Sequence, residues 1–428
     1  MLFAIKVPLT PPVVVQLFDW SFEEVSQVLP ELKEVGYSHI HISPVQKSVE
    51  NGKWWGKYQP LDYRKIEGPL GNREELMQLA KRAKEYEIVL IADVVFNHMA
   101  GAPHVRVGRG RLLDTNFADF SKEDFHPYAP IKDWSNEKQV RNRWLFGALP
   151  DLKTESPTVR AKLTAYLLDL QACGVGGFRV DSARHIPPED LKAIFDGIES
   201  SALVLGEIAE QSLEVFEPYL AELPEMAFFD FALQAQLATS LRGEESMSAW
   251  LKKGAIAKRL APEVSVRMLR NHDLDRGEDS LNEGIRDRRS IVPDNSWQVG
   301  YVALFGLGEG VPYVFVDCPY AEKEKGKEHD FDRKGLKESL LFFRATYGLE
   351  RKVFLEASGA VGWSLGHAAF VILSREACLE PEGFSVPQLK SGIYREVYSG
   401  EEVEVVEGVF SLPRFDALRG YAFQLMSR

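Results

Sequence analysis

The sequence predicts an α/β protein built on a (β/α)8 barrel, with a short insertion after the third strand and an all-β domain at the C-terminus. Three observations support this prediction. Eight short apolar segments recur before residue 320, amphipathic helical segments separate them, and short strands and turns replace this pattern after about residue 351. Strands that alternate with helices are typical of a parallel sheet whose crossover connections are helical.

The eight predicted strands are apolar at nearly every position, as expected for strands buried on both faces. They span residues 13–20, 39–45, 89–98, 177–183, 203–208, 227–233, 264–273 and 311–317.

Local signals mark the helices between these strands. Asn72 followed three residues later by Glu75 indicates a capping box at a helix N-terminus. Ser156 and Pro157 indicate another helix start, with proline at the first helical position. Pro30 lacks a backbone N–H, so we expect it to break the first helix into two short pieces.

The strand and helix pattern also divides the chain. We expect the barrel to comprise residues 1–98 and 151–350, interrupted by an insertion over 99–150 that is rich in Gly, Pro, Asp and His. Residues 351–428 lack long helical segments and are predicted to form a C-terminal β-sandwich domain.

Composition narrows the possible partners. The 428 residues carry a formal net charge of −12, which argues against nucleic-acid binding and suits a neutral substrate such as a polysaccharide. No apolar run approaches the length of a membrane span. The three cysteines are scattered, and the first residues do not resemble a signal peptide. We expect a cytoplasmic monomer, or a secreted protein if a signal precedes residue 1.

Polar side chains gather where four of the predicted strands end. In a (β/α)8 barrel these ends share one rim, which carries the active site. One carboxylate there could simply form an ion pair or cap a helix, but a whole set on one rim predicts a catalytic site. The set comprises Asp93, Asn97, His98, Arg179, Asp181, Arg184, His185, Glu207, Asn271, His272 and Asp273.

These segments resemble the α-amylase family of glycoside hydrolases over roughly residues 10 to 345. The similar motifs are DVVFNH at 93–98, LPDLK at 149–153, GFRVDSARH at 177–185, LGEI at 205–208 and RNHD at 270–273. Within the family, WWGKYQPLDY at 54–63 is similar to the animal-type α-amylases.

The resemblance implies three catalytic carboxylates. Asp181 matches the nucleophile, Glu207 the general acid/base and Asp273 the residue that stabilises the transition state. A retaining glycosidase needs a carboxylate to attack the anomeric carbon and a second group to protonate the leaving oxygen. We expect Arg179 to keep Asp181 ionised, and the two aspartates to raise the pKa of Glu207.

The resemblance also implies substrate contacts. His98 and His272 match histidines that hold hydroxyls of the sugar undergoing cleavage, and Tyr58 matches the aromatic residue on which that sugar stacks. We expect Trp55 to add a stacking surface. Arg184, which stands where the family commonly has lysine, and His185 are expected on the leaving-group side. Trp134 and Trp144 are instead predicted to be core residues, as are His39 and His41; Tyr313 is predicted to pack in the barrel or at its rim.

A structural calcium ion is the cofactor that the resemblance implies. Its matching ligands are Asn97, Asp151 and the backbone carbonyl of His185, all oxygen donors, which a hard cation prefers. Chloride is not expected to bind, because the eighth predicted strand lacks the basic residue of chloride-activated relatives.

Three functions remain open. The first is an α-amylase that hydrolyses internal α-1,4 links of an α-glucan or maltooligosaccharide. The second is a 4-α-glucanotransferase or related enzyme of the same fold, in which a sugar rather than water accepts the glycosyl group. The third is a non-catalytic relative, which the presence of Asp181, Glu207 and Asp273 disfavours. Activity on α-1,6 links would depend on the shape of the loops.

Overall fold

The structure is a computed structural model that describes residues 11–199, 201–276, 292–319, 335–377, 383–412 and 414–426. The first ten residues, which bear on the expectation about a signal peptide, lie outside this set, as does Cys378. Cys173 is a buried free thiol. Within the described residues, no helix is both long and apolar enough to cross a membrane.

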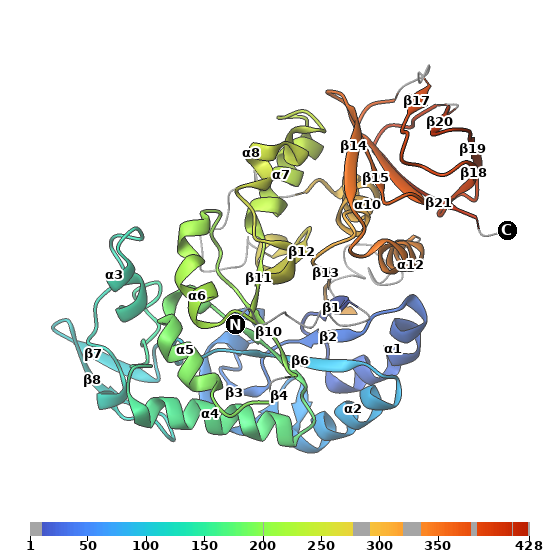
Figure 1. The fold of residues 1–428 in the computed structure, drawn as a ribbon. Coiled ribbons are helices and arrows are strands. Elements are labelled where there is room, and N and C mark those ends of the chain that lie inside the picture. Colours follow the sequence, from blue (N-terminus) through green and yellow to red (C-terminus); the bar gives the residue numbers. More distant parts are fainter. Residues whose placement is uncertain are drawn as a thin grey trace.

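Eight parallel strands close into a barrel, which confirms the predicted fold class. Their order around the barrel follows the chain, and the last strand pairs with the first (Figure 1). Each predicted segment contains one strand, but every strand ends earlier than predicted. Asp181, Glu207 and Asp273 therefore lie beyond the last paired position, whereas Asp93 and Arg179 pair with each other inside neighbouring strands. The strands are β1 (Val14–Leu17), β2 (His39–Ile42), β6 (Val89–Val94), β9 (Gly177–Val180), β10 (Leu203–Gly206), β11 (Ala227–Phe229), β12 (Ser265–Met268) and β13 (Val311–Val316).

Helices in the connections surround these strands (Figure 1). They are α1 (Phe22–Val35), α2 (Arg73–Glu85), α4 (Pro157–Ala172), α5 (Pro188–Phe195), α6 (Glu217–Glu222), α7 (Phe231–Arg242), α8 (Lys253–Ile256), α9 (His272–Asp275), α10 (Trp297–Gly306) and α12 (Leu336–Thr346). The capping box of Asn72 and Glu75 is present. Pro157 opens α4 as predicted, although the Ser156 side chain makes no cap hydrogen bond.

The prediction that Pro30 breaks the first helix is wrong, because α1 runs through it without interruption. Pro30 lies on the exposed side of the helix, so water can reach the carbonyl group that the missing N–H leaves free. The opposite side buries Phe22, Val25 and Leu29 in the core. This packing, with a capping box at Ser21, offsets the local cost of about 3 kcal/mol for a proline inside a helix.

Two excursions extend the barrel on its catalytic side. A sheet of β3 (Gln46–Ser48), β4 (Pro60–Gly68) and β5 (Gly71–Asn72) follows β2. After β6, the chain forms the hairpin of β7 (Val105–Gly108) and β8 (Arg111–Thr115) and then helix α3 (Glu137–Asn142). In Figure 1 the hairpin and α3 project to one side of the barrel. The insertion returns beside the segment that follows β6, where Leu152 N donates to Asn97 O over 2.9 Å.

The C-terminal part consists of antiparallel sheets, at the opposite end of the molecule from the insertion (Figure 1). It attaches to helix α10: Trp363 Nε1 donates to Gly306 O over 2.7 Å, and Gln298 bonds both backbone groups of Gly420. One sheet has six strands, in the order β14 (Arg351–Glu356), β15 (Ala360–Leu365), β16 (Ala369–Ser374), β21 (Arg419–Leu425), β18 (Gly392–Glu396) and β19 (Glu402–Val405). In a second, two-stranded sheet, β17 (Phe384–Ser385) pairs with β20 (Val409–Phe410).

Candidate active site

The three predicted catalytic carboxylates line one cleft at the carboxyl ends of the strands. Asp181 directly follows β9, Glu207 directly follows β10, and Asp273 lies on α9 just beyond β12. The cleft has a volume of about 550 Å³. Six of the predicted substrate-binding residues also line it, namely Trp55, Tyr58, His98, Arg184, His185 and His272.

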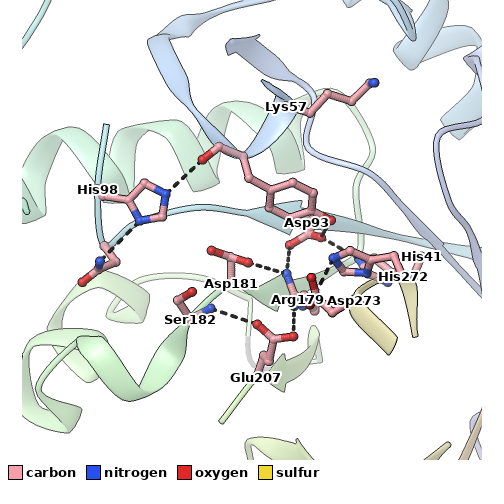
Figure 2. A network of polar contacts seen from close by, with 12 residues as sticks. His41, Lys57, Asp93, His98, Arg179, Asp181, Ser182, Glu207, His272 and Asp273 are labelled. Atoms are coloured by element: carbon pink, nitrogen blue, oxygen red, sulfur yellow. Dashed lines mark hydrogen bonds and ion pairs between the residues drawn. The ribbon is translucent and has the colours of Figure 1, made fainter. Parts of the chain in front are cut away.

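Arg179 lies beneath this cleft and connects the carboxylates. Its side chain, only 1% exposed, projects from β9. One terminal nitrogen lies 2.8 Å from Asp93 Oδ1 and 2.9 Å from Asp181 Oδ1, and the other lies 2.5 Å from Glu207 Oε1. Figure 2 shows these contacts converging on the guanidinium group. One cation thus faces three carboxylates from three different strands.

Burial and charge set the pKa values of these groups in opposite directions. Burial alone would raise the pKa of Asp93, but the Arg179 guanidinium and His41 hold it well below its usual value. Burial raises the pKa of Glu207 against the effect of Arg179, and the neighbouring charges of Asp181 and Asp93 add to the rise. The pKa of Asp273 is also raised, by burial and then by Glu207. Glu207 therefore has the proton affinity that a general acid needs.

The pKa of Asp181 differs from the sequence-based expectation. Burial raises it above the usual value, although Arg179 opposes the rise. Arg179 thus favours the ionised form, as expected, but it divides its charge among three carboxylates instead of serving Asp181 alone.

An aromatic stack forms one wall of the site. The Tyr58 ring lies parallel to the His272 ring with centroids 5.2 Å apart, and Phe18 stacks on His272 at 4.5 Å. The Tyr58 hydroxyl donates to Asp93 Oδ2 over 2.8 Å, and His98 Nε2 donates to the Tyr58 carbonyl over 2.9 Å. Burial lowers the pKa of His98 to about 4 and holds the pKa of His272 well below its usual value, so both rings are neutral at pH 7 and able to bond sugar hydroxyls.

Sequence reasoning missed a buried pair that supports Asp93. His41 is fully buried, as predicted, but its Nδ1 lies 2.7 Å from the Tyr313 hydroxyl and its Nε2 lies 3.4 Å from Asp93 Oδ2. Figure 2 shows His41 beside Asp93. The sequence offered one signal for this pair, which is the histidine on an apolar strand. A buried histidine needs hydrogen-bond partners, and the barrel interior near a charged group can supply them.

The insertion contributes aromatic residues to the cleft, which corrects one prediction. Trp134 was expected in the core, but 46% of it is exposed and it lines the cleft together with Phe146. Trp144 is buried, as predicted. An exposed tryptophan in an irregular segment has no periodic signal that separates it from a buried one.

The predicted calcium ligands converge at the base of the insertion. One terminal atom of the Asn97 side-chain amide lies 3.2 Å from the carbonyl oxygen of His185 and 3.1 Å from Asp151 Oδ1. With the amide oxygen in this position, three oxygens face one another, which is the arrangement that a hard cation stabilises. With the amide nitrogen there, Asn97 instead donates hydrogen bonds to both oxygens. In the first orientation, the donors are oxygens of an amide, a carboxylate and a backbone carbonyl, and this donor chemistry fits calcium.

His126 was not predicted but holds the same carboxylate. Its Nδ1 lies 2.6 Å from Asp151 Oδ2, and its Nε2 lies 3.1 Å from Glu155 Oε1. One oxygen of Asp151 is thus bound by the insertion, and the other faces Asn97. Among the described residues, no group of three His, Cys, Asp or Glu side chains could bind a metal, so a calcium site here depends on amide and carbonyl oxygens.

Comparisons with known proteins agree with this geometry. A family model described as "Alpha amylase, catalytic domain" matches residues 21–315. An α-amylase of Aeromonas hydrophila is 31% identical over 372 residues, which cover 78% of each chain. An α-amylase-related protein of Drosophila auraria is 30% identical over 289 residues, but the match covers only 58% of that protein. The chain belongs to the α-amylase family of glycoside hydrolases.

Solved structures show the same fold at low sequence identity. Wild-type α-amylase I of Eisenia fetida is 19% identical and gives a TM-score of 0.81, with 98% of both chains covered. A mutant of that enzyme in complex with maltohexaose gives 0.82 at 18% identity, with 97% of both chains covered. A cyclomaltodextrin glucanotransferase with three domains gives 0.75 at 17% identity, covering 98% of this chain and 100% of its own.

Arg179 should be required for folding stability as well as for chemistry. Replacement by Met leaves three buried carboxylates without their cation, and we expect a loss of about 3–5 kcal/mol in unfolding free energy at pH 7. The carboxyl pKa values then rise further in the folded state, so the loss should shrink as pH falls towards 5 and the groups protonate. Urea unfolding at both pH values measures this. Arg64→Met, at a side chain that is 58% exposed, is the control. Equal losses of unfolding free energy at both pH values would contradict the role of Arg179 as the cation that stabilises these carboxylates.

Proposed function

We propose that this protein is an α-amylase that hydrolyses internal α-1,4-glucosidic bonds in starch, glycogen and maltooligosaccharides with retention of configuration. The observation that carries the proposal is the set of three carboxylates, on three strand ends, around the buried Arg179 in a single open cleft. Membership of the α-amylase family supports it, as does the α-amylase of Aeromonas hydrophila among its relatives.

The proposed chemistry has two steps. Asp181 attacks the anomeric carbon while Glu207 gives its proton to the departing glycosidic oxygen, so a covalent glycosyl ester forms and the leaving chain departs as an alcohol. Glu207, now ionised, takes a proton from water, which attacks the same carbon and releases Asp181. Asp273 stabilises the positive charge that develops on the sugar ring in both steps.

A 4-α-glucanotransferase is the alternative, because the same intermediate can be passed to a sugar hydroxyl. The likeness to a cyclomaltodextrin glucanotransferase concerns the fold, and it leaves this alternative open. Incubation with maltoheptaose and sizing of the products separates the two activities. We expect chains shorter than seven units to dominate throughout. Early accumulation of longer chains would favour the transferase.

Each catalytic carboxylate should be indispensable. Asp181→Asn, Glu207→Gln and Asp273→Asn should each lower kcat on maltoheptaose by at least about a thousandfold, because each has a separate role in the reaction, while the melting temperature stays near that of the wild type. NMR of fresh wild-type product should show the α-anomer first. Initial release of the β-anomer would rule out Asp181 as the nucleophile.

We further propose that a structural calcium ion binds Asn97 Oδ1, Asp151 Oδ1 and the carbonyl oxygen of His185. The convergence of the Asn97 side-chain amide on Asp151 Oδ1 and on the carbonyl oxygen of His185 supports the proposal. The ion would join the end of β6, the return of the insertion and the turn Ala183–His185 beside the cleft. His126 would keep Asp151 oriented by holding its second oxygen, as groups around a metal ligand commonly do.

Metal removal should lower stability and activity together. Binding to the folded state alone adds about 2.7 kcal/mol at a hundred times the dissociation constant, so chelated protein should melt lower and calcium should restore it. Asp151→Asn should remove the response to calcium. Calorimetric titration of stripped wild type and variant with calcium measures binding directly. Absence of binding to the wild type, with melting unchanged by chelation, would contradict the site.

A further inference from the structure

The hairpin of β7 and β8 carries a positively charged surface in a chain whose net charge is −12. Residues 104–116 contain three arginines and one aspartate. All three arginines are exposed, and none forms an ion pair with another described residue. Two aliphatic side chains between them are 38% and 45% exposed. We call these five residues the basic tip: Arg106, Val107, Arg109, Arg111 and Leu113.

The basic tip takes no part in the catalytic cleft, because none of its residues lines that cleft. Arginine and apolar side chains are enriched where proteins meet a partner. Cations without a partner beside exposed aliphatic groups therefore indicate a surface that another molecule can cover.

The C-terminal domain carries a surface of the opposite sign. Ile393 lies opposite Glu404 across β18 and β19, and Val406 continues the same face two residues beyond Glu404. Val406 and Val409 exchange two backbone hydrogen bonds and are 54% and 51% exposed. Three exposed glutamates around these side chains form no ion pair with a described residue. We call this set the acidic corner: Ile393, Glu401, Glu404, Val406, Glu407 and Val409.

The two surfaces match in charge and in their exposed aliphatic groups, but they cannot meet within one molecule. In Figure 1 the hairpin of β7 and β8 lies at the opposite end of the molecule from β18 and β19. A basic tip can therefore reach only the acidic corner of another copy. The net charge of −12 opposes general association, but salt screens exposed charges beyond about 8–10 Å, so the charges at the contact itself decide the interaction.

We propose that the basic tip of one copy docks on the acidic corner of a second copy, so that the protein associates head to tail. The contact joins two different surfaces, so each pair keeps one free tip and one free corner, and association continues beyond the dimer or closes into a ring. Both surfaces are small beside the roughly 800 Å² per partner of a stable interface, so the association is weak and sensitive to salt. The monomer expected from the sequence rested on overall charge, which conceals this local reversal of sign.

Sedimentation velocity of the full chain tests the association. We expect the average mass to rise with protein concentration at about 20 mM salt and to rise much less at about 500 mM salt. Charge reversal of either surface should raise the dissociation constant at least about tenfold. The tip variant combines Arg106→Glu, Arg109→Glu and Arg111→Glu, and the corner variant combines Glu401→Lys, Glu404→Lys and Glu407→Lys.

Mixing the two variants distinguishes head-to-tail docking from a symmetric dimer. The tip variant keeps a native corner and the corner variant keeps a native tip, so the mixture should form dimers that grow no further. A chain with both sets of reversals should associate again. A wild type that stays monomeric at low salt, or a mixture that does not pair, would overturn the proposal.

A matched control separates docking from net charge. Reversal of three exposed lysines outside both surfaces makes the same change in net charge and should leave the association of the wild type largely intact; these are Lys33→Glu, Lys192→Glu and Lys337→Glu. All variants should keep the wild-type activity on maltoheptaose, which reports that they fold. If a triple variant folds poorly, Val107→Ser and Val406→Ser should each weaken association. A monomeric wild type that binds phosphatidylglycerol vesicles through the tip would assign the tip to a lipid surface and overturn the proposal.

Discussion

The catalytic end of the barrel depends on one buried cation. Asp93, Asp181 and Glu207 come from three neighbouring strands and lie close together, which their mutual repulsion would oppose without Arg179. A guanidinium group can bond all three at once, and it stays protonated even when buried. The shared cation also lets the carboxyls differ in proton affinity: Asp93 remains ionised, while Glu207 has a raised pKa. A site built from three independent ion pairs could not couple the groups in this way.

The sequence predicted most of the barrel because its signals are local. Strands buried on both faces read as apolar runs, and each of the eight begins within a residue of its predicted start. The catalytic carboxylates were found because a charge at the end of an apolar strand needs an explanation. The effect of Pro30 was predicted wrongly because the sequence shows only the local cost of a proline in a helix. The packing that offsets this cost joins the other side of the helix to the barrel.

The parts that escaped prediction depend on contacts between distant segments. His126 meets Asp151 and Glu155, and Arg184 meets the carbonyl of Trp134, across separations of 25 to 50 residues in an irregular region. The periodic patterns that predict helices and strands do not indicate contacts of this kind. Tyr313 is similar, because its hydroxyl meets His41 across the barrel interior, 272 positions away in the chain. The insertion is thus attached to the barrel by side chains whose importance becomes visible only in three dimensions.

The pairing of β1 with β13 has a consequence for folding during synthesis on the ribosome. Val14 lies opposite Tyr313 and Leu17 opposite Val316, so the barrel cannot close until about three-quarters of the chain has been synthesised. Until then, the nascent barrel has two unpaired strand edges, which are templates for pairing with other chains. Closing a loop of this length also makes folding slow. Production in a cell should therefore be more sensitive to chaperone supply and to the rate of translation than the stability of the finished enzyme would indicate.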